Sequence, residues 1–207
     1  MRLLLWGAGG HGKVVYDVVV ASGAFEEVAV IDDDPVRRFD GLPVAGTSEA
    51  LAALRRKGYE SCLVSIGPNL TRAKCYRTAV AHGFYGATAI HSSAVVSPSA
   101  TIGAGTVVMP NAVINAGAQI GQNCIINTGA IVEHDCRIAD HVHISPRVVL
   151  GGAVTVGRYA HIGIGAVVLP GAAAGEESVV GAGAVVLKEA PAHCTVVGVP
   201  AKVLVPA

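Results

Sequence analysis

The chain has 207 residues, of which 52% are apolar and only 14% charged, and its formal net charge at pH 7 is zero. This length leaves room for one large domain or two modest ones, and the balanced charge gives no reason to expect nucleic acid or a membrane as a partner. The first apolar run, Leu3 to Trp6, is too short for a signal peptide or a membrane span. The cysteines form no CxxC pair, so we expect a cytoplasmic protein without disulfides or a zinc site.

Residues 1–85 alternate between short apolar runs and helical patterns. The expected strands are 3–6, 28–31 and 62–66, and the expected helices are 14–21, 48–57 and 71–82. Ser48 is the expected cap of the second helix, and Gly58 its end. This order predicts a small Rossmann-like α/β domain, with a parallel sheet and helices on its faces.

A glycine-rich loop follows the first strand. Gly7, Gly9 and Gly12 fit the pattern GxGxxG between a strand and a helix, and Asp32 ends the second strand. Backbone N–H groups at the start of a helix bind phosphate well, although a tight turn alone would need the same glycines. Because the domain is too small for a second mononucleotide half, one nucleotide diphosphate fits better than NAD. Asp32 and Asp33 lie where such a ligand would be contacted.

From Ile90 to Val186 the chain repeats every six residues. One position of the repeat is aliphatic: Ile90, Val96, Ile102, Val108, Ile114, Ile120, Ile126, Val132, Ile138, Ile144, Leu150, Val156, Ile162, Val168, Val180 and Val186, with Ala174 as the exception. Four places later stands a small or slim residue, such as Ala94, Cys124 or Cys136. Such a hexad predicts a parallel β-helix in which three hexads close one triangular coil, with about five coils in all. Glycine after the aliphatic residue is expected to supply the conformations of the corners.

The segment Glu133-His134-Asp135 stands out because charged residues are sparse among the hexads. One interpretation is a solvated corner of the β-helix. The other is a general base, since a neutral imidazole oriented by a carboxylate accepts a proton from an attacking amine or hydroxyl group. His143 follows nine residues after His134.

The hexad resembles the left-handed β-helix of the hexapeptide-repeat acyltransferases, which are typically trimers that bind acyl-CoA between neighbouring prisms. A narrower resemblance, over essentially the whole chain, is to the bacterial sugar acetyltransferases of the PglD/NeuD kind. It is carried by the following segments: Gly9-Gly10-His11-Gly12-Lys13, Ile31-Asp32-Asp33, Ser65-Ile66-Gly67-Pro68-Asn69, Glu133-His134-Asp135, His143 and Gly198-Val199-Pro200-Ala201-Lys202.

The resemblance implies a fold, a division of the chain and a set of roles. Residues 1–85 would be the Rossmann-like nucleotide-sugar domain, and residues 86–207 a left-handed β-helix domain with a short tail. His134 would be the catalytic base and Asp135 its carboxylate partner, where the relatives carry the longer Glu. His143, Gly152, Ile164 and Ala182 would bind acetyl-CoA. The nucleotide-sugar site would comprise Gly9, Gly10, His11, Asp32, Asp33 and Gly67.

The expected function is therefore N-acetylation of a nucleotide-linked 4-amino sugar by acetyl-CoA, in a homotrimer, without a metal. Direct attack by the amine needs no acyl-enzyme, and no cysteine is placed to form one. Acetylation of a hydroxyl group of sialic acid or another sugar is the alternative. A scaffold or a carbonic-anhydrase-like β-helix is a third reading, which would need zinc at His141, His143 and His161. We interpret His141 and His161 as surface or packing residues.

Overall fold

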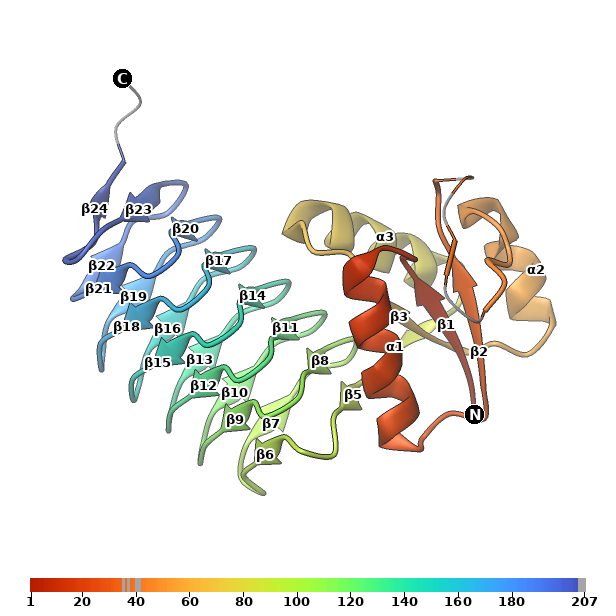
Figure 1. The fold of residues 1–207 in the computed structure, drawn as a ribbon, viewed down its shortest axis with the longest axis horizontal. Coiled ribbons are helices and arrows are strands. Elements are labelled where there is room, and N and C mark those ends of the chain that lie inside the picture. Colours follow the sequence, from red (N-terminus) through yellow and green to blue (C-terminus); the bar gives the residue numbers. More distant parts are fainter. Residues whose placement is uncertain (35, 37, 40–41, 205–207) are drawn as a thin grey trace.

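The computed structural model describes residues 1–34, 36, 38–39 and 42–204. A small α/β unit at the amino terminus is followed by a long parallel β-helix, and the last described residues lie at the far end of the β-helix (Figure 1). The predicted combination of folds, a parallel α/β sheet and then a β-helix of hexapeptide repeats, is confirmed. None of the described helices is long and apolar enough to cross a membrane.

The α/β unit contains one parallel sheet. Its strands lie in the order β2 (Glu27–Ile31), β1 (Arg2–Trp6), β3 (Ser61–Val64) and β4 (Tyr85–Gly86). Its helices are α1 (Gly10–Ser22), the 3-10 turn η1 (Ser48–Ala50), α2 (Leu51–Arg56) and α3 (Asn69–Ala81). The three leucines of β1 are fully buried, as expected of a central strand that is covered on both faces.

Some boundaries differ from the predicted ones. Helix α1 begins at Gly10 rather than at residue 14, because the glycine loop leads directly into its first turn. Ser48 is not a cap but the first residue of η1, which leads into α2; the cap of η1 is Thr47, whose hydroxyl oxygen accepts a 3.4 Å hydrogen bond from the Glu49 N–H. Strand β4 was not predicted, because two residues are too few to show a periodic pattern.

The β-helix has three faces, each built from two-residue strands one coil apart. The helix-covered face consists of β5 (Ala89–Ile90), β8 (Val107–Val108), β11 (Ile125–Ile126), β14 (His143–Ile144), β17 (His161–Ile162), β20 (Val179–Val180) and β23 (Thr195–Val197), with β24 (Lys202–Val203) antiparallel at its end. The valine face consists of β6 (Val95–Val96), β9 (Val113–Ile114), β12 (Ile131–Val132), β15 (Val149–Leu150), β18 (Val167–Val168) and β21 (Val185–Val186). The open face consists of β7 (Thr101–Ile102), β10 (Gln119–Ile120), β13 (Arg137–Ile138), β16 (Thr155–Val156), β19 (Ala173–Ala174) and β22 (Glu189–Ala190).

The hexad register predicts the interior of the β-helix correctly. The aliphatic position and the small position of the repeat together form one continuous core, and even Ala174 is buried. Cys124 and Cys136 are fully buried in it, as the small inward residues should be. The described part of the valine face and of the open face has six strands each, so there are six coils rather than about five. The sixth coil is completed by β22, which lies beyond Val186, where the hexad count stops.

The glycines that follow the aliphatic residues have a different role from the predicted one. Gly103 and Gly163 have ordinary φ angles, and a Cβ atom on either would lie 2.6 Å from the backbone of the next coil. These glycines therefore permit close stacking of coils. The left-handed residue of each corner comes two places later and is often not glycine, as at Asn123 (φ 52°) and Asp135 (φ 60°).

The α/β unit packs against the amino-terminal coils of the β-helix. Helix α1 contacts β5, and its valines share a core with Val107, Met109 and Ile125. Helix α3 reaches the corner between the open face and the helix-covered face. The chain passes from β4, which ends at Gly86, to β5, which begins at Ala89; the predicted division at residue 85 falls within β4.

Candidate active site

His134 and Asp135 lie at the corner between the valine face and the open face, which we call the His134 corner. The left-handed conformation of Asp135 bends the chain so that the two neighbouring side chains meet, and His134 Nδ1 lies 2.9 Å from Asp135 Oδ2. Both side chains are exposed. A carboxylate only accepts, so Nδ1 carries the proton and Nε2 keeps a free lone pair. Glu133 has another partner, because its carboxylate accepts a 3.0 Å bond from Asn115 Nδ2.

Gly152 lies one coil above His134 at the same corner. A Cβ atom at Gly152 would lie 2.5 Å from His134 Nε2 and 2.6 Å from Cε1, so the imidazole covers the place that a side chain would occupy. The Gly152 carbonyl oxygen accepts a hydrogen bond from the Gly171 N–H. Within the described chain the Gly152 N–H has no hydrogen-bond partner. The residue next to the His134 imidazole therefore has an unused backbone donor.

A second group of polar residues lies on the helix-covered face. The rings of His143 and His161 stack with centroids 4.8 Å apart and an interplanar angle of 2°. Asn127 Nδ2 lies 3.1 Å from His143 Nε2; since an amide NH₂ group only donates, the ring proton of His143 sits on Nδ1. The Ser145 hydroxyl lies 2.9 Å from His161 Nε2.

These residues line a hollow of about 540 Å³ at the edge between the helix-covered face and the valine face, which we call the hollow corner. Ile164 and Ala182, predicted to line the acetyl-CoA groove, both belong to it. The wall is mostly apolar, with His143 and Ser145 as polar contacts, which suits a long, flexible acyl carrier with a polar end. The residues present therefore fit the predicted co-substrate.

The histidines near this hollow are neutral. Burial, followed by the neighbouring His161 and Arg72, lowers the pKa of His143 from 6.5 to about 3. Burial and then Arg72 lower the pKa of His11 to about 4, and the His11 and His143 ring centroids are 6.3 Å apart. Near neutral pH both imidazoles therefore act as hydrogen-bonding groups without charge.

The glycine loop has the close packing expected of a phosphate-binding turn. Gly7 has a φ of 123°, and its carbonyl oxygen accepts a 2.8 Å bond from the Ser65 hydroxyl. A side chain on Gly12 would collide with that same carbonyl, whereas Gly10, at the start of α1, faces open space. The first turn of α1 is therefore accessible to an anion.

Asp32 and Asp33 bind the backbone of the chain itself. The Asp32 carboxylate accepts hydrogen bonds from the N–H groups of Ala8, at 2.6 Å, and Asp34, at 2.9 Å. Asp33 accepts a 2.7 Å bond from the Ser48 N–H. Asp32 thus fixes the glycine loop, and its predicted contact with a ligand stays a prediction.

Apart from Asp32 and Asp33, the predicted site residues fall into two groups within one chain. The first group lies where the α/β unit meets the β-helix and along the hollow corner. It consists of Gly9, Gly10, His11, Gly67, His143, Ile164 and Ala182. The second contains His134, Asp135 and Gly152, at the His134 corner. The hollow corner and the His134 corner run along the two opposite edges of the valine face. One chain therefore does not bring the base and the hollow together.

Sequence reasoning missed Asn127, which orients His143, and Arg72, which is buried beneath the site. Asn127 and His143 occupy neighbouring coils, so the coil spacing would have revealed that contact. His141 is a packing residue, stacked on Tyr159 with ring centroids 5.1 Å apart. Among the residues that the structure describes, no three histidine, cysteine or carboxylate side chains are arranged to hold a metal ion.

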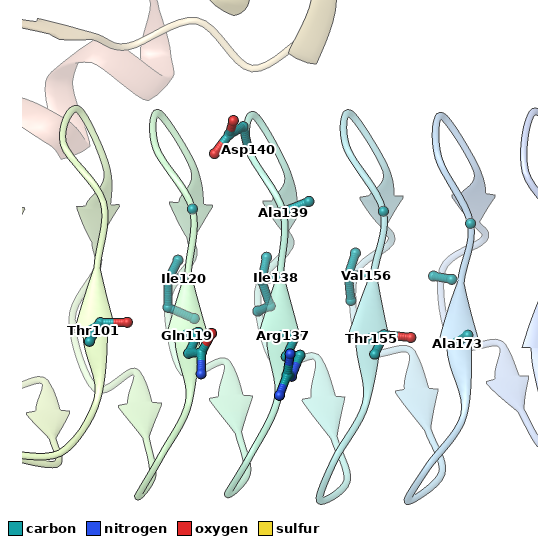
Figure 2. Close-up of a pocket in the computed structure, with 14 residues that line it drawn as sticks. Thr101, Gln119, Ile120, Arg137, Ile138, Ala139, Asp140, Thr155, Val156 and Ala173 are labelled. Atoms are coloured by element: carbon teal, nitrogen blue, oxygen red, sulfur yellow. The ribbon is translucent and has the colours of Figure 1, made fainter.

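A further hollow, of about 660 Å³, lies along the open face (Figure 2). Outward Gln119, Arg137 and Thr155 stand in a row along it, and Asp140 lies at its edge. It contains neither the His134 pair nor the stacked histidines, so we do not assign the reaction to it.

The comparisons with known proteins agree with this fold. The profile of the PglD N-terminal domain matches residues 2–79, and that of six bacterial transferase hexapeptide repeats matches residues 117–152. A histidine-substituted perosamine N-acetyltransferase from Caulobacter crescentus, solved with CoA and GDP-perosamine, is 44% identical. That match covers 100% of this chain and 98% of the other, with a TM-score of 0.96. The acetyltransferase domain of PglB from Neisseria gonorrhoeae FA1090 is 40% identical over 98% of this chain and 99% of its own, with a TM-score of 0.94.

Among curated proteins, UDP-N-acetylbacillosamine N-acetyltransferase of Bacillus subtilis (strain 168) is 42% identical over 104 residues. This match spans 48% of the chain and 47% of the relative's length. The near-complete structural matches with 40% identity or more establish the family. The chain belongs to the PglD family of hexapeptide-repeat sugar acetyltransferases.

Proposed function

We propose that the protein is an acetyltransferase that moves the acetyl group of acetyl-CoA to the amino group of a nucleotide-linked amino sugar, with His134 as the general base. The observation that carries this proposal is the 2.9 Å contact of His134 Nδ1 with Asp135 Oδ2. It leaves Nε2 free to accept a proton, and the carboxylate stabilises the imidazolium that forms. Relatives with 40% identity or more are named for N-acetyltransfer or solved with acetyl-CoA.

The residues at the His134 corner suit direct acetyl transfer. Acetyl-CoA supplies an activated acetyl group with a good thiolate leaving group. As the amine nitrogen bonds to the acetyl carbon and the carbon–sulfur bond breaks, His134 Nε2 takes a proton from the amine. The N–H of Gly152, a residue that packs against the imidazole, has no partner in the described chain and fits the role of a donor to the oxygen that becomes negative. Direct attack requires no nucleophilic side chain.

We assign the nucleotide-linked end of the acceptor to the α/β unit. The first turn of α1 offers backbone N–H groups to a diphosphate, and Gly10 leaves that turn open. His11, in this turn, and Gly67 both lie beside His143. The sugar would thus point from the α/β unit toward the β-helix. GDP-perosamine binds the Caulobacter relative, and the Bacillus relative is named for a UDP-linked sugar; both carry nucleoside diphosphates. The cysteines are free, which suits the cytoplasm, where such sugars are made.

We further propose that the working unit is a homotrimer. The outward residues of the valine face form an apolar stripe: Val95, Val113, Ile131, Val149, Val167 and Val185. Val95 is 62% exposed in the single chain. If three copies turn these faces toward a common axis, the His134 corner of each copy meets the hollow corner of the next, and the ring closes. The base would then act on an acetyl group held by the neighbouring copy.

The test is incubation of the protein with acetyl-CoA and a panel of UDP- and GDP-linked amino sugars, with the released thiol as the readout. We expect thiol release only with sugars that carry a free amino group. The product should resist hydroxylamine, because amides do and esters do not. Thiol release with sugars that lack a free amino group, such as sialic acid, and a hydroxylamine-labile product would instead establish O-acetylation and overturn the proposal.

A further inference from the structure

Arg72 is a buried cation at the junction of the α/β unit and the β-helix. It lies on α3 and is 1% exposed. Burial lowers the pKa of its guanidinium to about 10, so it remains charged at neutral pH. Among the described residues no carboxylate forms an ion pair with it. A buried charge without a counter-ion is costly unless every donor is satisfied.

Oxygen atoms from three separate segments satisfy these donors. Arg72 Nη1 donates to the carbonyl oxygens of Ile66, at 3.2 Å, and Gly67, at 2.8 Å. Nη2 donates to Asn69 Oδ1, at 2.8 Å, and to the carbonyl oxygens of His141, at 2.7 Å, and Val142, at 3.3 Å. Nε donates to the Asn123 carbonyl oxygen at 3.0 Å. The planar fork of arginine suits this task, and lysine could not reach all of these acceptors.

The three segments differ in how firmly they are otherwise held. The corners at Asn123 and His141 belong to the β-helix, where each coil is hydrogen-bonded to the neighbouring coils. The His141 N–H donates to the Gln122 carbonyl oxygen, and the Asn123 N–H donates to the Ala104 carbonyl oxygen. The Ile66–Gly67 segment is a loop after β3, outside any strand or helix. Arg72 holds both of its carbonyl groups, and Gly67 adjoins His143.

We propose that Arg72 is a positioning residue. It holds the loop at Ile66 and Gly67, the Gly67 loop, in a fixed position relative to the coil that carries His143. The loop lies on the acceptor side of the site, and His143 lies on the acetyl-CoA side. This inference rests on the proposed function. Arg72 touches neither substrate in this arrangement and acts through the carbonyl groups that it holds. Its loss would leave the rigid β-helix in place and free the loop.

The predicted effect is therefore unequal for the two substrates. In Arg72→Met, acetyl-CoA should bind as in the wild type, whereas kcat/KM for the nucleotide-linked amino sugar should fall on the order of 10²-fold, as is typical when a reactant is misplaced by about 1 Å. Amide hydrogen exchange in residues 65–69 should become faster. Arg77→Met is the matched control, because Arg77 lies on the same helix and bonds Tyr159 Oη at 3.2 Å without touching the loop.

Two milder variants keep the proposal testable if Arg72→Met does not fold. Arg72→Lys keeps the charge but loses most of the acceptors, and it should not restore the kinetics. Asn69→Ala removes one acceptor of Arg72 and the bonds of Asn69 to the Tyr159 and Ala160 carbonyl oxygens, so it should show a smaller effect of the same kind.

Calorimetry with each substrate, steady-state kinetics and hydrogen exchange are measured on all four variants. A lower melting temperature with wild-type kinetic constants would show that Arg72 only stabilises the fold and would overturn the proposal. Equal losses for both substrates would also overturn it. If the wild type turns over no amino sugar, the proposed function fails by itself; unchanged exchange of residues 65–69 in Arg72→Met would then separately refute the anchoring of the loop.

Discussion

At the scale of single residues, the chemistry depends on the free Nε2 of His134. Its partner Asp135 is adjacent in sequence and reaches it through the left-handed corner, with Nδ1 and Oδ2 2.9 Å apart. Asp135 therefore reaches the imidazole although its side chain is one methylene shorter than that of Glu.

We predict that His134→Ala lowers kcat by about 10²–10⁴, the usual contribution of a general base. Because the side chain is exposed and makes no core contact, binding of both substrates and the melting temperature should not change. Kinetics and calorimetry check this. A kcat within a few-fold of the wild type would mean that another residue is the base.

Gly152 offers a second test at the same corner. Its φ angle does not require glycine, and the equivalent place is Pro170 in the next coil and Ala116 two coils before. The absence of a side chain is instead explained by His134, whose ring would lie 2.5 Å from a Cβ atom at Gly152. Gly152→Ala should therefore push the imidazole aside and lower kcat on the order of 10²-fold, without unfolding the corner.

The control for Gly152→Ala is the same change in a His134→Ala background. If the methyl group acts by moving the ring, it should cost little further activity there. An equal loss in both backgrounds would show that the methyl group acts on a substrate instead.

The buried histidines predict how stability depends on pH. The folded-state pKa values of His143 and His11, about 3 and about 4, lie below the ordinary value of 6.5. Below pH 6.5 the unfolded chain therefore binds protons that the folded chain does not, and the free energy of unfolding decreases. At pH 5 the loss should be roughly 1–2 kcal/mol per histidine. Above pH 6.5 these groups should have no effect.

Urea unfolding at pH 7.5, 6.5 and 5.0 measures this loss, and His143→Gln serves as the control, because an amide does not titrate in this range. The decrease between pH 6.5 and 5.0 should be smaller in the variant. Equal stability of the wild type at all three pH values would contradict the burial of neutral histidines.

At the scale of elements, the glycine loop and β2 are coupled through Asp32. Its carboxylate accepts hydrogen bonds from the N–H groups of Ala8 and Asp34. We predict that Asp32→Ala weakens binding of the nucleotide-linked sugar about tenfold or more, since the loop loses a charge-assisted bond, and spares acetyl-CoA binding. Asp32→Asn keeps one acceptor and should show a smaller effect.

Calorimetry with each ligand separately tests this prediction. Equal losses for both ligands, or none for either, would show that the α/β unit does not bind the sugar nucleotide.

The sequence is sufficient to predict the elements whose residues repeat. The hexads predict which side chain of each strand points inward, because every coil imposes the same geometry. The glycine pattern likewise predicts the turn before α1. The role of Gly163 was not predictable, since the sequence does not show whether glycine serves a positive φ or a close approach. The contacts of Arg72 join three segments that no local pattern relates.

At the scale of the whole molecule, the division of the predicted site residues between two edges supports the proposed homotrimer. His134 and Gly152 lie along one edge of the valine face, and the hollow with Ile164 and Ala182 lies along the other. The sequence predicts both sets of residues. Their separation also follows from the hexad count, because His134 and Gly152 come after strands of the valine face, whereas Ile164 and Ala182 come after strands of the helix-covered face. In the proposed homotrimer, one copy supplies the base and its neighbour supplies the acetyl-CoA site.

The most direct measurement is the activity of mixed assemblies. His134→Ala removes the base, and Ala182→Trp fills the hollow, so each variant alone should be nearly inactive. In a randomly mixed ring of three, roughly one site in four would combine an intact corner with an intact hollow, so co-expression should restore about a quarter of the wild-type turnover. No recovery in a mixture shown to contain both chains would mean that a single chain holds the whole site, and would contradict the account.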